Sequence, residues 1–242
     1  MSQQKISGKS CRGFWAMCAL VAFGASVCAT PSQANRKDFV FAKEWKQPSK
    51  GERELELYTT YSNAKLTQAV ELDYGVTERF SVAPYVVFER ERGESLKYKE
   101  FKLEARYQLT KYKTGKFLPA IYGEYIKEKG GPSELEGIFI LSRYGKKGDN
   151  LSLNFVAERE LEDGAETETK YAVAYARPLG KSGSRIGLEW VQSLEAEKNI
   201  KFGPTTAFAA SDDIWIVAGY AFGLNNRGNN NDTIRLLAEY EF

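Results

Sequence analysis

Histidine is absent from all 242 residues, and its absence removes most of the catalytic chemistry that the other side chains could support. Without an imidazole, a serine or water nucleophile lacks its usual general base near neutral pH. Glu158 and Glu160 could suggest the carboxylate pair of a glycosidase, but at this spacing they are ordinary neighbours on one face of a strand. We therefore predict no catalytic residue and no enzymatic activity.

Two other stretches could hold a ligand. Gly180-Lys181-Ser182 matches the end of a phosphate-binding loop, but Tyr175 stands where that motif requires its leading glycine. Strands rather than a strand and a helix are expected around it, so we interpret the stretch as a turn. The asparagine-rich run Asn225–Asp232 is interpreted as an exposed loop.

The first 34 residues have the composition of a secretory signal peptide. They carry three basic residues and no acidic one, followed by an apolar run from Phe14 to Ala29. Cleavage could follow Ala29 or Ala34, and we predict the second site because a polar, charged segment begins at Asn35. An uncleaved anchor and lipidation at Cys28 are the alternatives. All three cysteines lie in this stretch, so the remainder has no thiol, and without His or Cys we predict no metal site and no cofactor.

Removal of residues 1–34 would take away three of the 34 basic residues and none of the 32 acidic ones, leaving a formal charge of −1. This balance gives no support to nucleic-acid binding. The mean hydropathy of −0.45 is compatible with a membrane barrel, because barrel strands alternate apolar and polar residues.

From residue 52 to residue 242 the chain repeats runs of period-two alternation, separated by short breaks of Gly, Asn, Asp, Lys or Pro. This spacing predicts β-hairpins throughout. The expected strands cover 52–62, 65–76, 79–90, 96–109, 117–128, 133–144, 150–162, 166–177, 185–195, 198–208, 213–223 and 232–242. Their even number would bring both ends of the chain to one side of a membrane.

The alternation divides each strand into an apolar face and a polar face. In the fourth expected strand Phe101 and Leu103 point one way, and Lys102 and Glu104 the other. The alternation is blurred in the fifth, sixth and eleventh strands, as at Ile138–Leu141. The side chains expected to face the inside are Glu54, Glu56, Glu71, Asp73, Lys102, Glu104, Arg106, Asn154, Glu158, Lys170, Glu189, Arg235 and Glu239.

Strand length separates a membrane barrel from a soluble sandwich, whose strands have about five or six residues. About ten residues, at roughly 3.3 Å each and tilted by about 40°, span a hydrocarbon layer of about 25 Å. We therefore predict an all-β fold, a transmembrane antiparallel up-and-down barrel of about 12 strands over residues 52–242. A soluble periplasmic β-protein is the disfavoured alternative.

The chain ends on Leu237-Ala238-Glu239-Tyr240-Glu241-Phe242, with apolar or aromatic residues at every second position before the last Phe. This ending resembles the C-terminal assembly signal of Gram-negative outer-membrane barrels. The resemblance implies that Tyr240 and Phe242 are read by the barrel-assembly machinery. It also implies export to the outer membrane, with lipid as a partner of the outer face.

A second resemblance lies in Glu71-Leu72-Asp73-Tyr74-Gly75-Val76-Thr77-Glu78-Arg79-Phe80. It is similar to the "YG[IV]T[DE]RF" pattern of uncharacterised outer-membrane barrels described as transport proteins near aromatic-degradation pathways. We interpret Gly75–Arg79 as a tight periplasmic turn between two strands. The resemblance implies a barrel type and does not imply a solute. Outer-membrane enzyme families resemble one another in using a catalytic His, which this chain lacks.

The leading functional hypothesis is a porin-like passive pore or uptake channel for a small solute. Its lumen or selectivity candidates are Lys102, Glu104, Arg106, Glu71, Asp73, Arg235 and Glu239. The alternative is a closed structural or surface-interaction barrel, in which the same charges pair across a narrow lumen. Residues 35–51 are expected to form a periplasmic N-terminal leader, which either folds inward or rests on the periplasmic side. The sequence leaves the oligomeric state open.

Overall fold

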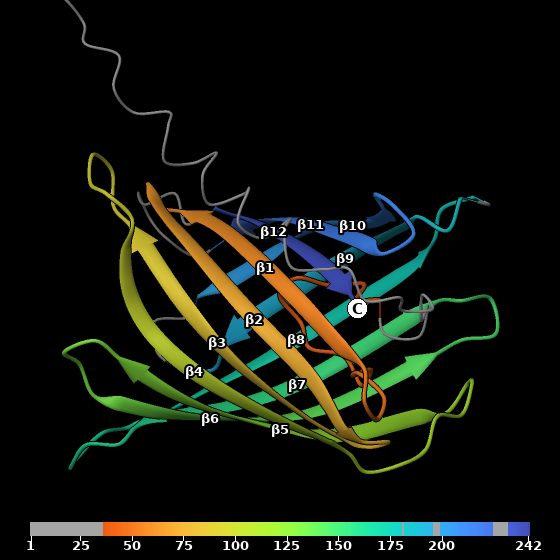
Figure 1. The fold of residues 1–242 in the computed structure, drawn as a ribbon, viewed down its shortest axis with the longest axis horizontal. Helices are drawn as coiled ribbons and strands as arrows, with labels where there is room; N and C mark the ends of the chain where they lie inside the picture. Colours follow the sequence, from red (N-terminus) through yellow and green to blue (C-terminus); the bar gives the residue numbers. More distant parts are fainter. Residues whose placement is uncertain (1–35, 181, 196–198, 225–231) are drawn as a thin grey trace, which may run out of the picture.

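Twelve strands form one closed antiparallel barrel (Figure 1), which confirms the predicted fold class. The computed structural model describes residues 36–180, 182–195, 199–224 and 232–242; the predicted signal peptide, Lys181 and residues 225–231 of the asparagine-rich loop lie outside these ranges. The strands are β1 (Arg53–Ser62), β2 (Lys65–Thr77), β3 (Phe80–Arg90), β4 (Lys97–Gln108), β5 (Phe117–Glu128), β6 (Ser133–Tyr144), β7 (Asn150–Glu160), β8 (Thr167–Pro178), β9 (Arg185–Ser193), β10 (Ile200–Ala209), β11 (Ile214–Gly223) and β12 (Thr233–Glu241). Among the described residues, no helix is long and apolar enough to cross a membrane.

Each strand pairs with its sequence neighbours, and β1 pairs with β12 to close the ring. The closing register runs from Glu54 opposite Glu241 to Ser62 opposite Thr233. Every strand boundary lies within two residues of its predicted position. We call the end where β1 begins and β12 ends the terminal rim, and the opposite end the far rim.

The alternation sets the two faces as expected. On β4, Leu103 is 45% exposed on the outside, whereas Glu104 and Arg106 are each 1% exposed on the inside. An apolar outer surface with charged groups inside is the arrangement that a barrel needs in lipid, and the reverse of a soluble protein. The β1–β2 hairpin closes with Asn63 and Ala64 at φ values of 51° and 62°, as a type I′ turn requires.

The predicted turn at Gly75–Arg79 is wrong in its extent. β2 continues through Thr77, and only Glu78 and Arg79 separate it from β3. Gly75 lies at a register irregularity in the β2–β3 pairing. The Gly75 amide donates a hydrogen bond to the Glu52 carbonyl. Gly75 is therefore part of β2, and through it β2 also binds the backbone just before β1.

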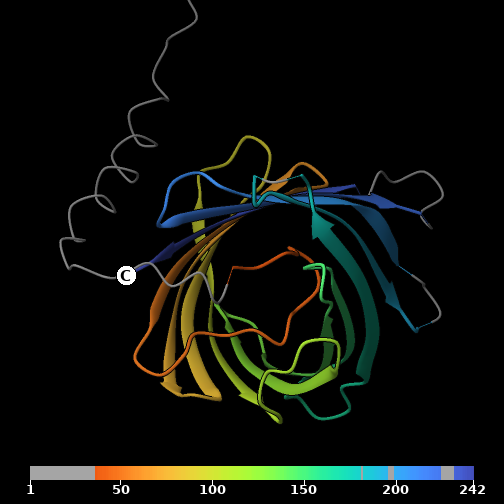
Figure 2. The same cartoon turned by 90° about the vertical axis from the view of Figure 1, so that its right-hand side faces the viewer.

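Residues 36–50 lie inside the barrel, which is the inward alternative of the sequence analysis. Figure 2 shows this segment, in orange, within the ring of strands. Phe39 is 2% exposed and Trp45 6%, so the segment is buried like a protein core. We call residues 36–50 the lumen segment. Most of its contacts fall on the half of the barrel next to the terminal rim, as at Ser142 of β6 and Trp215 of β11.

We predict that Gly75→Ala destabilises the folded barrel. A Cβ at this position would lie 1.8 Å from the Ser49 carbonyl oxygen, so the end of the lumen segment would have to move. Such overpacking costs about 1–3 kcal/mol, measurable as a lower denaturant midpoint of the detergent-folded protein. Gly137→Ala is the matched control, because its Cβ would have no neighbour closer than 4.0 Å. Equal midpoints for the two variants would contradict the close approach at Gly75.

Candidate functional site

The inside of the barrel carries the polar side chains that the alternation predicted. All thirteen residues expected to face inward are buried or half-buried. Four of the seven selectivity candidates line a cavity, namely Lys102, Arg106, Glu71 and Arg235. Glu239 contacts the lumen segment. Because most inward groups bond to one another or to the lumen segment, their positions depend on that segment.

Glu189, on β9, holds the apex of the lumen segment. Its carboxylate accepts hydrogen bonds from the backbone amides of Val40, Phe41 and Ala42, at 3.0, 2.8 and 2.8 Å. Three convergent amides make a concave anion site, and hydrogen bonds to a charged acceptor are stronger than neutral ones. Glu189 therefore replaces the strand partner that this stretch of backbone lacks.

Basic and amide side chains of the wall satisfy the carbonyl groups of the same segment. Arg106 donates to the Lys46 carbonyl at 2.7 Å, and Gln108 donates to the Trp45 carbonyl at 3.0 Å. Arg235, on β12, donates to the Val40 carbonyl at 2.9 Å. The segment is thus hydrogen-bonded from β4 and from β12.

Asn154, on β7, pairs with Lys43 as a neighbouring strand would. Its side-chain oxygen accepts from the Lys43 amide at 2.7 Å, and its side-chain nitrogen donates to the Lys43 carbonyl at 2.9 Å. The Ser142 hydroxyl accepts from the Trp45 amide at 3.0 Å. Buried backbone groups in the segment therefore have side-chain partners, which avoids the cost of leaving them unsatisfied.

Apolar patches on the inner wall receive the aromatic side chains of the segment. Trp45 packs on β5 and β6, including Ile138 and Ile140, and Phe39 packs on the alanines of β8. Val40 packs on Val217 and its neighbours near β11. The blurred alternation of β5, β6 and β11 has this cause: inward positions that would be polar in an empty barrel are apolar where the segment lies.

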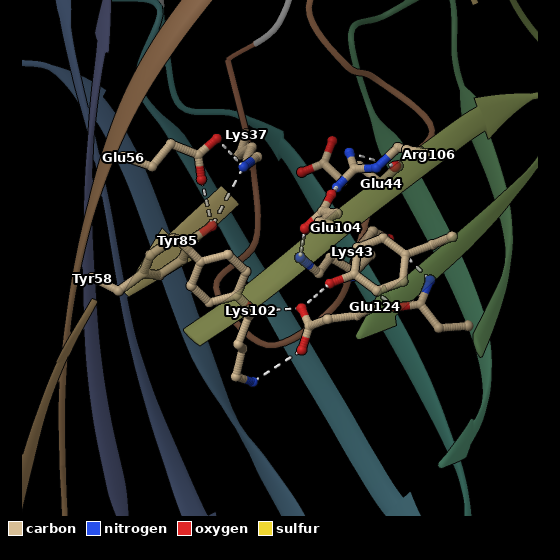
Figure 3. Close-up of polar contacts among 12 residues, drawn as sticks. Lys37, Lys43, Glu44, Glu56, Tyr58, Tyr85, Lys102, Glu104, Arg106 and Glu124 are labelled. Atoms are coloured by element: carbon tan, nitrogen blue, oxygen red, sulfur yellow. Dashed lines mark hydrogen bonds and ion pairs between the residues drawn. The ribbon is translucent and has the colours of Figure 1, made fainter. Parts of the chain in front are cut away.

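Ion pairs connect the lysines of the segment to the wall (Figure 3). The Lys37 ammonium contacts the Glu56 carboxylate, and the Lys43 ammonium lies 3.0 Å from Glu104. Glu104 also pairs with Arg106 at 2.7 Å. Burial alone would lower the pKa of Lys37, but the carboxylates around it, Glu56 first, raise that pKa well above its ordinary value.

A cavity of about 520 Å³ lies on the far-rim side of the lumen segment. Lys102 pairs with Glu124 at 2.9 Å on its wall, and the Tyr85 hydroxyl also donates to Glu124 (Figure 3). The Tyr122 hydroxyl is a further donor to Glu124. Sequence reasoning did not single out Tyr85 or Glu124. They occupy inward positions in strands where proline or consecutive apolar residues obscure the alternation.

Two cations of this cavity have no ion-pair partner in the part of the chain that the structure describes. Lys201 donates to the Thr233 hydroxyl at 3.0 Å, and Arg235 donates to the Thr60 hydroxyl and to the Val40 carbonyl. Within the described ranges, neither contacts a carboxylate within ion-pair distance. The β10 and β12 side of the cavity therefore offers positive charge, whereas Glu71 and Glu136, on β2 and β6, line the same cavity and also form no ion pair among these residues.

The assembly-signal residues Tyr240 and Phe242 lie at the terminal rim, with ring centroids 5.8 Å apart in a stacked arrangement. Both rings are half-buried. Recognition by the assembly machinery stays a prediction.

No known protein family matches the sequence, and no curated protein does. Solved structures match the fold. An outer-membrane channel from Pseudomonas putida F1 is 9% identical with a TM-score of 0.64, over 84% of this chain and 100% of that one. The KdgM porin in complex with disordered oligogalacturonate is 10% identical (TM-score 0.59; 78% and 99% covered), and the NanC porin 8% identical (TM-score 0.58; 78% and 100% covered). At these identities the likeness shows the fold alone, which is that of outer-membrane β-barrels.

We predict that the packing of the lumen segment inside the barrel is more stable at low pH than at neutral pH. Burial, and then the Asp38 carboxylate, raise the pKa of Glu44 to about 7 from an ordinary value of 4.5. The folded protein therefore binds this proton more tightly than the unfolded chain does. The resulting stability is fully present below pH 4.5 and is lost as the pH rises to about 7.

Hydrogen exchange of the amides of residues 37–47, corrected for the intrinsic pH dependence, measures this effect. Protection should fall between pH 4.5 and 7 in the wild type. Glu44→Gln, which resembles the protonated carboxyl and still faces Asp38 and Asn150, should remove the change. The same pH dependence in both proteins would show that Glu44 is not responsible.

Proposed function

We propose that this protein is a passive outer-membrane channel for small solutes, whose lumen is narrowed by its own N-terminal segment. The observation that carries the proposal is the cavity of about 520 Å³, enclosed by the barrel wall and bounded on the terminal-rim side by residues such as Phe39 and Lys43. A closed barrel with a charged interior can hold and pass hydrophilic solutes that lipid excludes.

The charge distribution next to β10 and β12 supports a preference for anionic solutes on that side of the cavity. Lys201 and Arg235 line the cavity without a carboxylate partner among the described residues, whereas Lys102 is neutralised by Glu124. Charged side chains in a pore wall set ion selectivity. The KdgM porin, which shares this fold, has been seen with an acidic oligosaccharide, which is compatible with the preference.

A closed structural barrel is the second candidate. The observation in its favour is that the lumen segment bonds to opposite walls, through Glu189 on one side and through Glu104 and Arg106 on another. If these contacts never open, the inner charges serve as a salt-bridged core and nothing passes.

Planar-bilayer conductance of the refolded full chain separates the two candidates. Glu189→Ala leaves the three amides of the segment apex without their acceptor, a loss of about 1–3 kcal/mol. We expect discrete current steps from the wild type, and larger or more frequent ones from Glu189→Ala. Glu91→Ala, in an exposed turn, is the control and should match the wild type. Folded barrels that are silent in all three proteins would favour the closed structural barrel.

We predict that Lys201→Glu reduces anion preference. A two-unit charge change, roughly 10 Å from a permeating ion at a dielectric constant of about 80, alters the permeability of that ion by about fourfold. Because anions and cations are affected in opposite directions, the anion-to-cation permeability ratio should fall by about 16-fold. Reversal potentials under a salt gradient measure this ratio. Lys146→Glu, in an exposed turn at the terminal rim, is the matched control. A ratio that shifts equally in both variants would assign the effect to overall charge.

A further inference from the structure

We propose that the inner wall at β1, β2 and β4 binds a hard divalent cation of the Ca²⁺ class through a cluster of carboxylates centred on Asp73. Two groups of acids each place their oxygens within 4.8 Å of one another. One consists of Glu54, Glu56 and Asp73, and the other of Glu71, Asp73 and Glu104. All five residues are buried. Asp73 belongs to both groups and is therefore the shared ligand.

The strand register forces these acids together. Glu54 stands directly opposite Asp73 on the neighbouring strand, and Glu56 directly opposite Glu71. Like charges in directly opposed positions destabilise a sheet. The barrel could have avoided this cost with one neutral residue in each pair, so the repeated pairing requires a compensating charge.

The protein's own cations compensate only part of this charge. Lys37 contacts Glu56, and Lys43 and Arg106 both contact Glu104. Lys37 is also shared with the buried carboxylate of Glu239, at 3.9 Å, and none of these three basic side chains forms an ion pair with Asp73 or Glu71 in the ranges that the structure describes.

Asp73 provides the second, independent sign of a ligand. Its side chain is 1% exposed, and its Oδ1 atom has no hydrogen-bond partner in the ranges that the structure describes. Neither Asp73 nor Glu71 forms an ion pair within those ranges. A buried carboxylate oxygen without a partner is costly unless something outside the chain satisfies it.

The donor set selects the kind of cation. Every ligand is a carboxylate oxygen, which suits Ca²⁺ or Mg²⁺ better than transition metals. Glu71 also lines the cavity, which gives the ion a route to the cluster.

Protons shared between the carboxylates are the alternative way to relieve the repulsion. The two explanations differ in their response to Asp73→Asn. A cation site loses its shared ligand, whereas a proton-sharing cluster loses only a repulsive charge. Added Ca²⁺ therefore changes the wild type and not the variant under the first explanation, and changes neither under the second.

The experiment uses the full chain refolded from inclusion bodies into detergent, so that no lipopolysaccharide brings its own cations. After treatment with EDTA and its removal, equilibrium binding of Ca²⁺ is measured together with thermal unfolding. We expect one saturable site in the wild type and a rise of about 5 °C in the midpoint at saturating Ca²⁺. Asp73→Asn should bind at least tenfold more weakly and lose the shift, and Asp163→Asn, in an exposed turn, should match the wild type.

Folding of each variant is checked by heat-modifiable electrophoretic mobility, and Glu71→Gln replaces Asp73→Asn if the latter does not fold. Absence of a saturable Ca²⁺ site in the wild type would overturn the proposal and favour shared protons. Equal affinity in the wild type and Asp73→Asn would also overturn it, because the bound ion would then lie elsewhere.

Discussion

A backbone inside a barrel has no strand beside it, and the need to satisfy its amides and carbonyls governs the interior of this protein. Side chains of the wall act as the missing partners: Glu189 accepts from three amides, and Asn154 both accepts and donates at Lys43. Arg106 on β4 and Arg235 on β12 donate hydrogen bonds to backbone carbonyl groups of residues 36–50. The inward polar residues are therefore the hydrogen-bonding surface for residues 36–50 as well as the lining of a lumen.

The strands and their inward faces were predictable because both depend on local alternation. The location of the lumen segment was not, because its contacts join residues far apart in the chain; Val40 and Glu189 are 149 positions apart. One local signal did exist. Ile138–Leu141 breaks the alternation because Ile138 and Ile140 receive Trp45, so an apolar inward position marks a surface with something packed on it.

The candidate site was likewise predictable only in part. Alternation identified Glu71, Asp73 and Glu104 as inward residues, but only the register shows that they share one cluster. The turn assigned to Gly75 was misplaced because glycine favours turns and also allows close backbone approach, here by the Ser49 carbonyl. Sequence alone does not separate these two uses.

The link between Val40 and Arg235 has a consequence for the order of folding. It spans 195 residues, and the ring itself closes between the first strand and the last. The lumen segment is the first described part of the chain, yet most of its partners lie on strands that follow much later. Its complete set of contacts, which includes Arg235 on the last strand, therefore requires that strand to be in place, and contacts of such long separation form slowly. The closing of the ring and the filling of its interior are therefore coupled, because the first described residues of the chain and its last strand reach their final contacts together.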